Sequence, residues 1–375
     1  MSENDQNIIE KNGAEIEGLD TSESIGWGDY PLDSVFVRNE QRTVHEVVKR
    51  IKAKRFILNP DFQRDFVWSV KKQSRLIESC LMRIPLPVFY VAEAEDGRII
   101  VVDGLQRLTT FIRYLDDEFG LSKLGDGKED APRDNPLFGK KFSALPVNLQ
   151  ERVEDTQLTL YILDSKAPQR AKLDIFERVN SGEPLARQQM RNCLFSGPST
   201  IWLRKAAESK AFLTATGGGL DKKTMRDREA INRFCAFRLL DISQYKSDMD
   251  DFLAKCLEKM NEKNEKELES LTHAFCKSME SNYLLFKRHT FRKSLTKEQT
   301  DTRSVINMAL FDVCSVIFSE TDPLSVANKT EKFRNVIISL LHEDRFVRSI
   351  TYATSSLEQV VTRFEMMEKA IREVV

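Results

Sequence analysis

The chain has 375 residues, which is enough for two or three domains with a sizeable core. Its 57 Lys and Arg residues balance 58 Asp and Glu residues, so the formal net charge is -1. That balance excludes a uniformly basic coat for nucleic acid, although a local basic face remains compatible with it. No uninterrupted apolar run of about 18 residues occurs, so we expect no membrane span.

The N-terminal stretch differs from the rest in charge. Residues 1–40 contain ten acidic and two basic residues, a net charge of -8, and few apolar residues before Ile25. Such a composition predicts disorder, and we place an acidic disordered tail at residues 1–35. The start of the chain has neither the basic residues nor the apolar core of a secretory signal, so we expect a cytoplasmic protein.

The cysteines and histidines argue against a metal or disulfide framework. Six cysteines lie far apart with no C-x-x-C pair, a pattern typical of buried reduced thiols in a chain of this length. None of the four histidines has metal-ligand spacing from another. A zinc hydrolase is therefore disfavoured.

Residues 41–195 mix helical and strand patterns. Apolar residues at helical spacing predict a helix at about 43–54, and Ser69 is a candidate N-cap for a second helix that ends before Pro85. Two β-rich runs, 88–92 and 98–102, flank a turn that contains Gly97, which predicts a hairpin. The remaining expected elements are a helix from about 105, a strand at 158–162, helices at about 167–179 and 185–195, and helical periodicity throughout from about 198.

The most informative stretch is the strand, glycine turn and helix start at residues 101–110. A helix N-terminus offers backbone N–H groups and a partial positive charge, which suit a phosphate, and Gly104 lets the backbone approach closely. Arg107 offers a fork of donors, Gln106 could position a water or a base, and Asp103 could hold a metal ion, bind a ribose hydroxyl or accept a proton. The alternative is a common Asp-Gly turn in which Asp103 caps the helix and Arg107 is a surface charge.

Two further segments combine polar side chains with turns. Gln63 and Arg64 repeat the Gln-Arg pair of the turn motif and could converge on the same anion, whereas the alternative is an aromatic core segment whose acids pair with Arg64. Arg178 and Asn180 precede a glycine and could reach a ligand, although a helix C-cap explains the same pattern.

Five motifs in this order resemble the N-terminal domain family of GmrSD-type, modification-dependent restriction endonucleases, a branch of the ParB/sulfiredoxin-like fold. The resemblance covers about residues 40–195. The family signature is Asp-Gly-x-Gln-Arg with Gln frequent at x, where this chain has Leu105. The motifs are FQRDFVWS at 62–69, LIES at 76–79, IPLP at 84–87, DGLQRLTT at 103–110 and IFERVNSG at 175–182.

The resemblance implies binding and hydrolysis of a nucleoside triphosphate, ATP or GTP, with Mg²⁺, in an anti-phage or DNA-restriction setting. It implies that Asp103, Gln106 and Arg107 act in catalysis and that Asp103 also holds the metal. The other residues that it implies for the nucleotide site are Gly104, Gln63, Arg64, Thr109, Arg178 and Asn180. Residues 196–375 show no His-Asn-His nuclease pattern, so we expect a separate nuclease subunit if DNA is cut.

The expected fold is α+β, with a small mixed sheet and helices in residues 36–196 and an all-helical domain in residues 197–375. The helical domain is a candidate sensor, partner-binding or dimerisation module, and DNA is a candidate partner. Two alternatives to an NTPase stay open. One is a non-catalytic DNA- or protein-binding module, and the other is a Mg²⁺-dependent nuclease that uses Asp61, Asp65 and Asp103.

Overall fold

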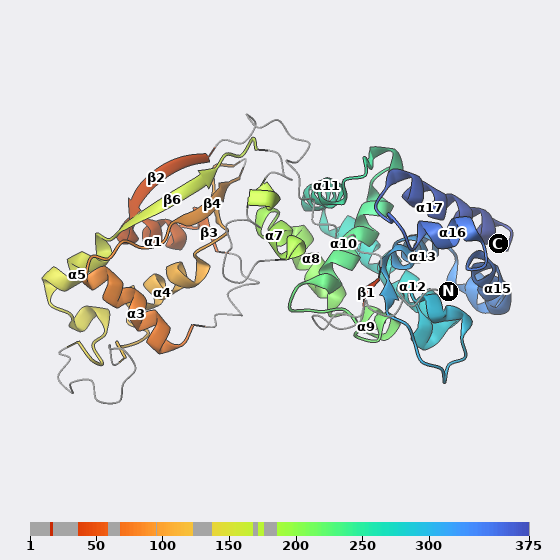
Figure 1. Cartoon of the computed structure of the whole chain (residues 1–375), viewed down its shortest axis with the longest axis horizontal. Helices are drawn as coiled ribbons and strands as arrows, with labels where there is room; N and C mark the ends of the chain where they lie inside the picture. The colour runs from red at the N-terminus through yellow and green to blue at the C-terminus, as the bar shows by residue number, and fades with distance from the viewer. Residues whose placement is uncertain are drawn as a thin grey trace, which may run out of the picture. The chain divides into compact units, whose positions relative to one another are not determined.

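The computed structural model describes residues 16–17, 37–58, 68–94, 96–122, 137–167, 172–175 and 186–374. The chain divides into two compact units (Figure 1). One consists of residues 27–194, and the other consists of residues 195–375 together with residues 1–26. The first unit mixes helices with a sheet and the second is helical apart from a sheet of two short strands, so the expected α+β class is confirmed. None of the described helices is long and apolar enough to cross a membrane.

The first unit is built on a five-stranded mixed sheet of order β2-β6-β4-β5-β3. β2 with β6 and β4 with β5 are antiparallel pairs, and β4 with β6 and β3 with β5 are parallel pairs. The strands are β2 (Val37–Thr43), β3 (Phe56–Ile57), β4 (Phe89–Glu93), β5 (Ile99–Val101) and β6 (Gln157–Leu163). The predicted hairpin and the strand around residue 160 are therefore confirmed.

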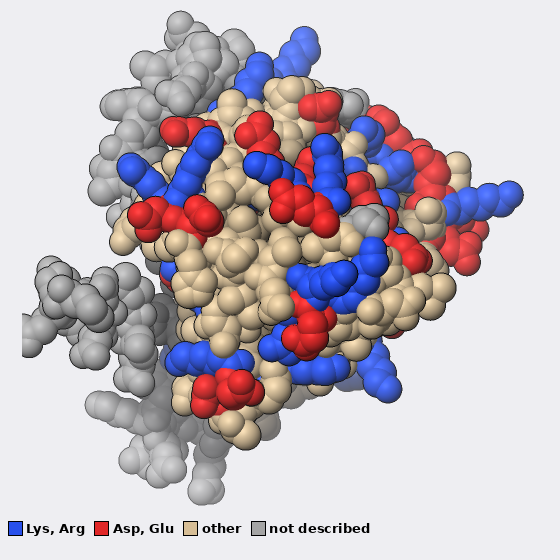
Figure 2. Space-filling model, turned by 90° about the vertical axis from the view of Figure 1, so that its right-hand side faces the viewer, with Lys and Arg blue, Asp and Glu red and all other residues tan. Residues whose placement is uncertain are grey.

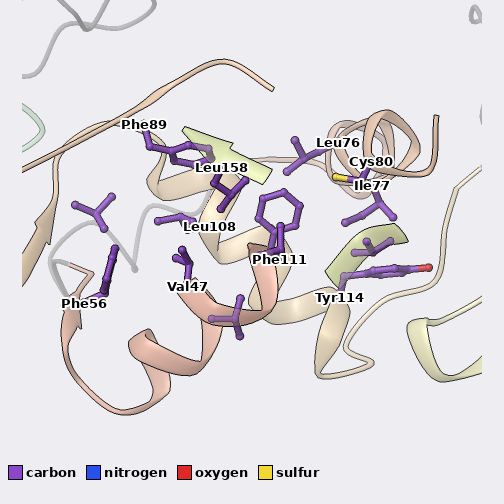
Figure 3. Packing of buried hydrophobic residues seen from close by; sticks show 14 of the residues in the cluster. Val47, Phe56, Leu76, Ile77, Cys80, Phe89, Leu108, Phe111, Tyr114 and Leu158 are labelled. Carbon is purple, nitrogen blue, oxygen red and sulfur yellow. The ribbon is translucent and has the colours of Figure 1, made fainter. Parts of the chain in front are cut away.

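Four helices cover one face of this sheet. Figure 3 shows Val47, Leu108 and Phe111 of the helices packed toward Phe89 and Leu158 of the strands, and all five side chains are fully buried. A smaller apolar cluster on the other face brings α7 against β4, β5 and β6. The helices are α1 (Val44–Lys52), α3 (Val70–Leu81), α4 (Leu105–Leu115), α5 (Val147–Glu154) and α7 (Arg187–Leu194).

Local signals fix the ends of these helices. The Ser69 hydroxyl accepts a hydrogen bond from the Lys72 N–H, which confirms the predicted N-cap of α3. Thr43 caps α1 in the same way through the Glu46 N–H. Of the helices expected at 167–179 and 185–195, the structure describes residues 172–175 and α7, and the intervening segments lie outside the described residues.

The helical unit is organised around α13 (Met308–Glu320), whose side chains are buried from Met308 to Ser319. It packs against α10 (Arg226–Leu239), α12 (Glu265–Phe286) and α17 (Leu357–Arg372). The other helices are α8 (Pro198–Ala207), α9 (Lys210–Thr216), α11 (Met249–Asn261), α14 (Pro323–Asn328), α15 (Thr330–Leu340) and α16 (Asp344–Ser349). All six cysteines are free thiols, and five of them are buried, as expected.

A short strand of the N-terminal segment belongs to the helical unit. β1 (Ile16–Glu17) pairs in parallel with β7 (Ile306–Asn307), and the Glu17 carboxylate forms an ion pair with the Lys293 ammonium. Two residues inside the predicted acidic tail are therefore docked. The rest of residues 1–35 lies outside the described residues.

Candidate functional site

The turn between β5 and α4 has the geometry of the predicted strand, glycine turn and helix. Gly104 is the N-cap of α4 and adopts φ +98°, in the left-handed region. A Cβ at this position would overlap the ring of Phe89, which packs directly beneath the turn. Glycine is therefore required here both by the backbone angle and by the close approach.

Within the described residues, no side chain caps the first turn of α4. Gly104 makes no side-chain capping hydrogen bond, and the helix ladder begins with the Leu108 N–H donating to the Gly104 carbonyl over 2.9 Å. The backbone N–H groups ahead of Leu108 thus lie outside the helix ladder, at the positive end of the helix dipole. This end of α4 has the features of an anion-binding helix terminus.

Asp103, directly before the N-cap of α4, pairs with Arg107 in the first turn of the helix. The Arg107 Nη2 donates to Asp103 Oδ2 over 2.8 Å, and the Asp103 side chain keeps 34% of its exposure. Among the described residues, no hydrogen bond to Asp103 Oδ1 occurs, so this oxygen remains open for a ligand. The backbone N–H of Asp103 donates to the Tyr90 carbonyl over 3.0 Å and fixes the turn to the start of β4.

Arg107 is buried, which rules out the surface-charge alternative. Its guanidinium donates to the Pro87 carbonyl, donates to the Val88 carbonyl over 3.0 Å and lies 4.1 Å from the centre of the Phe89 ring. Burial lowers the pKa of Arg107, and the Asp103 carboxylate opposes that shift. Arg107 therefore ties the segment before β4 to the turn before α4.

Gln106 and Thr109 lie on the less buried side of α4, because positions i and i+3 share a helix face. Arg107 and Thr110 on the adjoining flank of α4 are buried, and the Thr110 hydroxyl donates to the Gln106 carbonyl over 2.8 Å. The structure thus groups Asp103, Gly104, Gln106 and Arg107 at one helix start, with Thr109 one turn further. The other candidates, Gln63, Arg64, Arg178 and Asn180, lie outside the described residues.

Asp103 is a residue of the described site that could hold a metal ion. No group of three or more His, Cys, Asp or Glu side chains there could hold a metal ion as a cage. Mg²⁺ typically takes one or two carboxylates and completes its octahedron with waters and phosphates. The open oxygen of Asp103 suits that mode, whereas Asp61 and Asp65 of the nuclease alternative lie outside the described residues.

Sequence reasoning missed the partners of Arg107. The IPLP motif at residues 84–87 was visible, but its use as a source of carbonyl acceptors was not, because backbone carbonyls leave no mark in a sequence. The tightness of the Gly104–Phe89 contact was equally hidden, since alternation places Phe89 in the core without specifying its neighbour.

Comparison with protein families bears out the resemblance for this unit. Residues 44–196 match the family described as GmrSD restriction endonuclease, N-terminal domain. No curated protein matches the chain. The matched range contains all the described strands of the sheet except β2, together with the complete turn before α4.

Proposed function

We propose that residues 44–196, as a GmrSD-type N-terminal domain, bind and hydrolyse a nucleoside triphosphate within a DNA-restriction or anti-phage system. The family match supplies the restriction setting. The observation that carries the nucleotide assignment is the uncapped, glycine-initiated start of α4 with the open Asp103 carboxylate beside it. ATP and GTP are both candidates.

The roles follow from the positions of the side chains. The N–H groups of the Gly104 turn bind phosphate oxygens, and Asp103 Oδ1 is one ligand of the Mg²⁺ that the triphosphate carries. Gln106, which is half-buried in the first turn of α4, orients the attacking water. Arg107 acts as a positioning residue, because its described contacts hold Asp103 and the turn in place.

The test is phosphate release by the purified chain from each of the four common NTPs with Mg²⁺, with and without DNA. We expect release from at least one NTP and its loss in Asp103→Asn. Asp96→Asn is the matched control, because Asp96 also pairs with an arginine, Arg98, at 2.5 Å but lies in the hairpin turn. Equal rates for the wild type and Asp103→Asn would refute the assignment of Asp103.

One observation favours a second candidate, a non-catalytic DNA- or protein-binding module. Arg107 is engaged by backbone carbonyls and by Asp103, so its charge is already used inside the fold. This candidate predicts a salt-dependent DNA complex that nucleotide does not alter, with no phosphate release. On the face of the helical unit that Figure 2 shows, basic and acidic side chains lie side by side. This face therefore has no continuous positive patch that would attract DNA.

For the helical unit we propose a sensor or partner-binding role, with a separate nuclease subunit and self-association as candidate partners. If a separate subunit cuts DNA, the purified chain leaves a supercoiled plasmid intact in the presence of Mg²⁺ and NTP. Nicking by the pure protein that Asp103→Asn abolishes would instead revive the nuclease alternative.

A further inference from the structure

Two tyrosines lie side by side on the sheet without belonging to its core. Tyr90 in β4 and Tyr161 in β6 are direct partners across the parallel pair, with ring centroids 5.6 Å apart and an interplanar angle of 35°. Both rings are half-buried. Within the described residues, neither ring is part of a hydrophobic core cluster or of the apolar residues packed against one.

The pair occupies the sheet face opposite α1, α3 and α4. Side chains alternate along a strand, so Tyr90 points away from the face that Phe89 and Val91 bury against the helices. On this second face the small apolar cluster contains Ala92 and Leu163, each two residues beyond one of the tyrosines. The tyrosine pair thus adjoins the small cluster but is not absorbed into it.

Polar side chains extend the platform that the tyrosines form. Asn39 on β2 is the direct partner of Tyr161, and Gln41 is the partner of Thr159, so all four side chains share the face. Asn39 and Gln41 are exposed. An aromatic pair flanked by amides is the combination that proteins use to stack a base and to hydrogen-bond its edge.

The backbone beneath the tyrosine pair is hydrogen-bonded to the turn at the start of α4. The Tyr90 carbonyl accepts the N–H groups of both Val102 and Asp103 over 3.0 Å, so the backbone of the tyrosine is bonded directly to the turn. β4 and β5 are antiparallel, so the start of β4 lies beside the end of β5. Tyr90 is therefore near the same end of the strands as Gly104. A ligand that contacts both the ring pair and the helix terminus would pass around this end of the strands, because α4 packs on the opposite face of the sheet.

We propose that Tyr90 and Tyr161 form the stacking platform for the base of the nucleotide whose phosphates lie at the Gly104 turn, with Asn39 reading the edge of the base. This assignment rests on the proposed nucleotide function and adds to it the element that binds the base. The ligand that we propose for this site is a free nucleoside triphosphate. Stacking tolerates different bases, so selectivity among NTPs resides in Asn39.

The experiment measures binding by calorimetry of the preferred NTP and of inorganic triphosphate, which lacks a base. For Tyr161→Leu we expect affinity for the NTP to fall about tenfold while affinity for triphosphate is unchanged, since stacking on one ring accounts for that range. Tyr161→Phe keeps the ring and should bind as the wild type does. Tyr352→Leu is the matched control, because Tyr352 is 67% exposed in the helical unit.

The outcomes separate the two proposals. If the wild type binds the NTP and Tyr161→Leu, with an unchanged melting temperature, binds it equally well, the platform is refuted and the nucleotide function stands. If Tyr161→Leu has a lowered melting temperature, Tyr90→Leu is tested in its place, together with photolabelling of the wild type by an 8-azido NTP. We expect the label on the peptide that contains Tyr90 or Tyr161, and labelling elsewhere overturns the proposal. If the wild type binds neither NTP nor triphosphate, both proposals fail.

Discussion

Arg107 and Asp103 in the mixed unit form an ion pair at 2.8 Å, and Arg233 and Asp312 in the helical unit form one at 2.5 Å. The two pairs differ in what surrounds the carboxylate. Asp103 keeps 34% of its side-chain exposure and one open oxygen, whereas Asp312 is completely buried. The Arg–Asp pair of the mixed unit therefore has a carboxylate oxygen that a ligand can reach, whereas the pair of the helical unit has none.

The buried cluster joins three helices. Asp312 on α13 accepts from Arg233 Nε on α10 over 2.8 Å and from Arg363 Nη2 on α17 over 3.1 Å. Arg363 also donates to the Thr354 carbonyl over 2.6 Å, and burial lowers its pKa to about 10 against the pull of Asp312. Both carboxylate oxygens of Asp312 accept hydrogen bonds, so this cluster stabilises the packing of the helices and has no oxygen left for a ligand. The exposure of the aspartate therefore separates a structural ion pair from one that can bind a ligand.

The largest effect should follow from breaking the buried cluster. Asp312→Ala leaves two arginines buried without their counter-ion, which costs about 3–5 kcal/mol of unfolding free energy. Denaturant unfolding of the full chain measures this loss in the helical transition. Glu368→Ala is the matched control, because its pair with Arg372 is exposed and contributes less than about 1 kcal/mol. Similar losses for the two variants would contradict the structural role of Asp312.

Arg107→Ala should have the next largest effect. It leaves the Pro87 and Val88 carbonyls without their donor and removes the contact with the Phe89 ring, at a cost of about 2–4 kcal/mol. Arg107→Lys keeps the charge but lacks the fork, so an intermediate loss is expected. Unfolding free energies of both variants give the measurement, and an unchanged value for Arg107→Ala would mean that its contacts contribute nothing.

Two glycines isolate the role of the Phe89 contact. Gly104 and Gly97 both have positive φ, +98° and +77°, but only an added Cβ at Gly104 would meet a neighbour. We expect Gly97→Ala to cost about 1 kcal/mol from backbone strain alone and Gly104→Ala to cost about 2–3 kcal/mol. Equal costs, measured by thermal unfolding, would show that Phe89 yields to the extra methyl group.

The smallest effect concerns pH and His289. Its Nε2–H donates to the Glu298 carbonyl over 2.9 Å, and its Nδ1 lies 2.9 Å from the Ser294 hydroxyl oxygen. Burial lowers the pKa of His289 below its ordinary value of 6.5, with smaller contributions from Arg288 and Arg292.

The sign of the pH effect follows from this lowered pKa. The unfolded histidine takes up a proton near pH 6.5 and the folded one at lower pH, so its contribution is full above pH 6.5 and is lost as the pH falls through the folded pKa. His289→Gln should therefore flatten the fall in stability between pH 7 and pH 5.5. The exposed His342→Gln should not, and equal slopes for the wild type and His289→Gln would argue against the assignment.

The sequence predicted the parts of the fold that have regular periodicity. The hairpin and the helices α1, α3 and α4 followed from apolar spacing and from signals such as Ser69 and Gly104. β2 was missed because its sequence, VRNEQRT, places polar residues on both faces of the strand. The alternation of apolar and polar residues that predicts a strand is therefore absent, although β2 pairs with β6 along its whole length.

The site was predictable only in part. The turn motif identified Asp103, Gly104, Gln106 and Arg107 as neighbours, but not that Arg107 faces inward to backbone carbonyls. The Arg233–Asp312–Arg363 cluster escaped prediction entirely, because its members are brought together by tertiary packing of distant helices. The periodicity of apolar residues predicts which side chains are buried. Contacts between residues far apart in the chain can be identified only from the three-dimensional structure.

The most direct test combines turnover and stability for one variant. Phosphate release from the preferred NTP and the unfolding free energy are measured for the wild type and Asp103→Asn. For Asp103→Asn we expect a stability within about 1 kcal/mol of the wild type, since the pair is partly exposed, and a loss of at least about 100-fold in turnover. Turnover at the wild-type rate in a stably folded Asp103→Asn protein would contradict it.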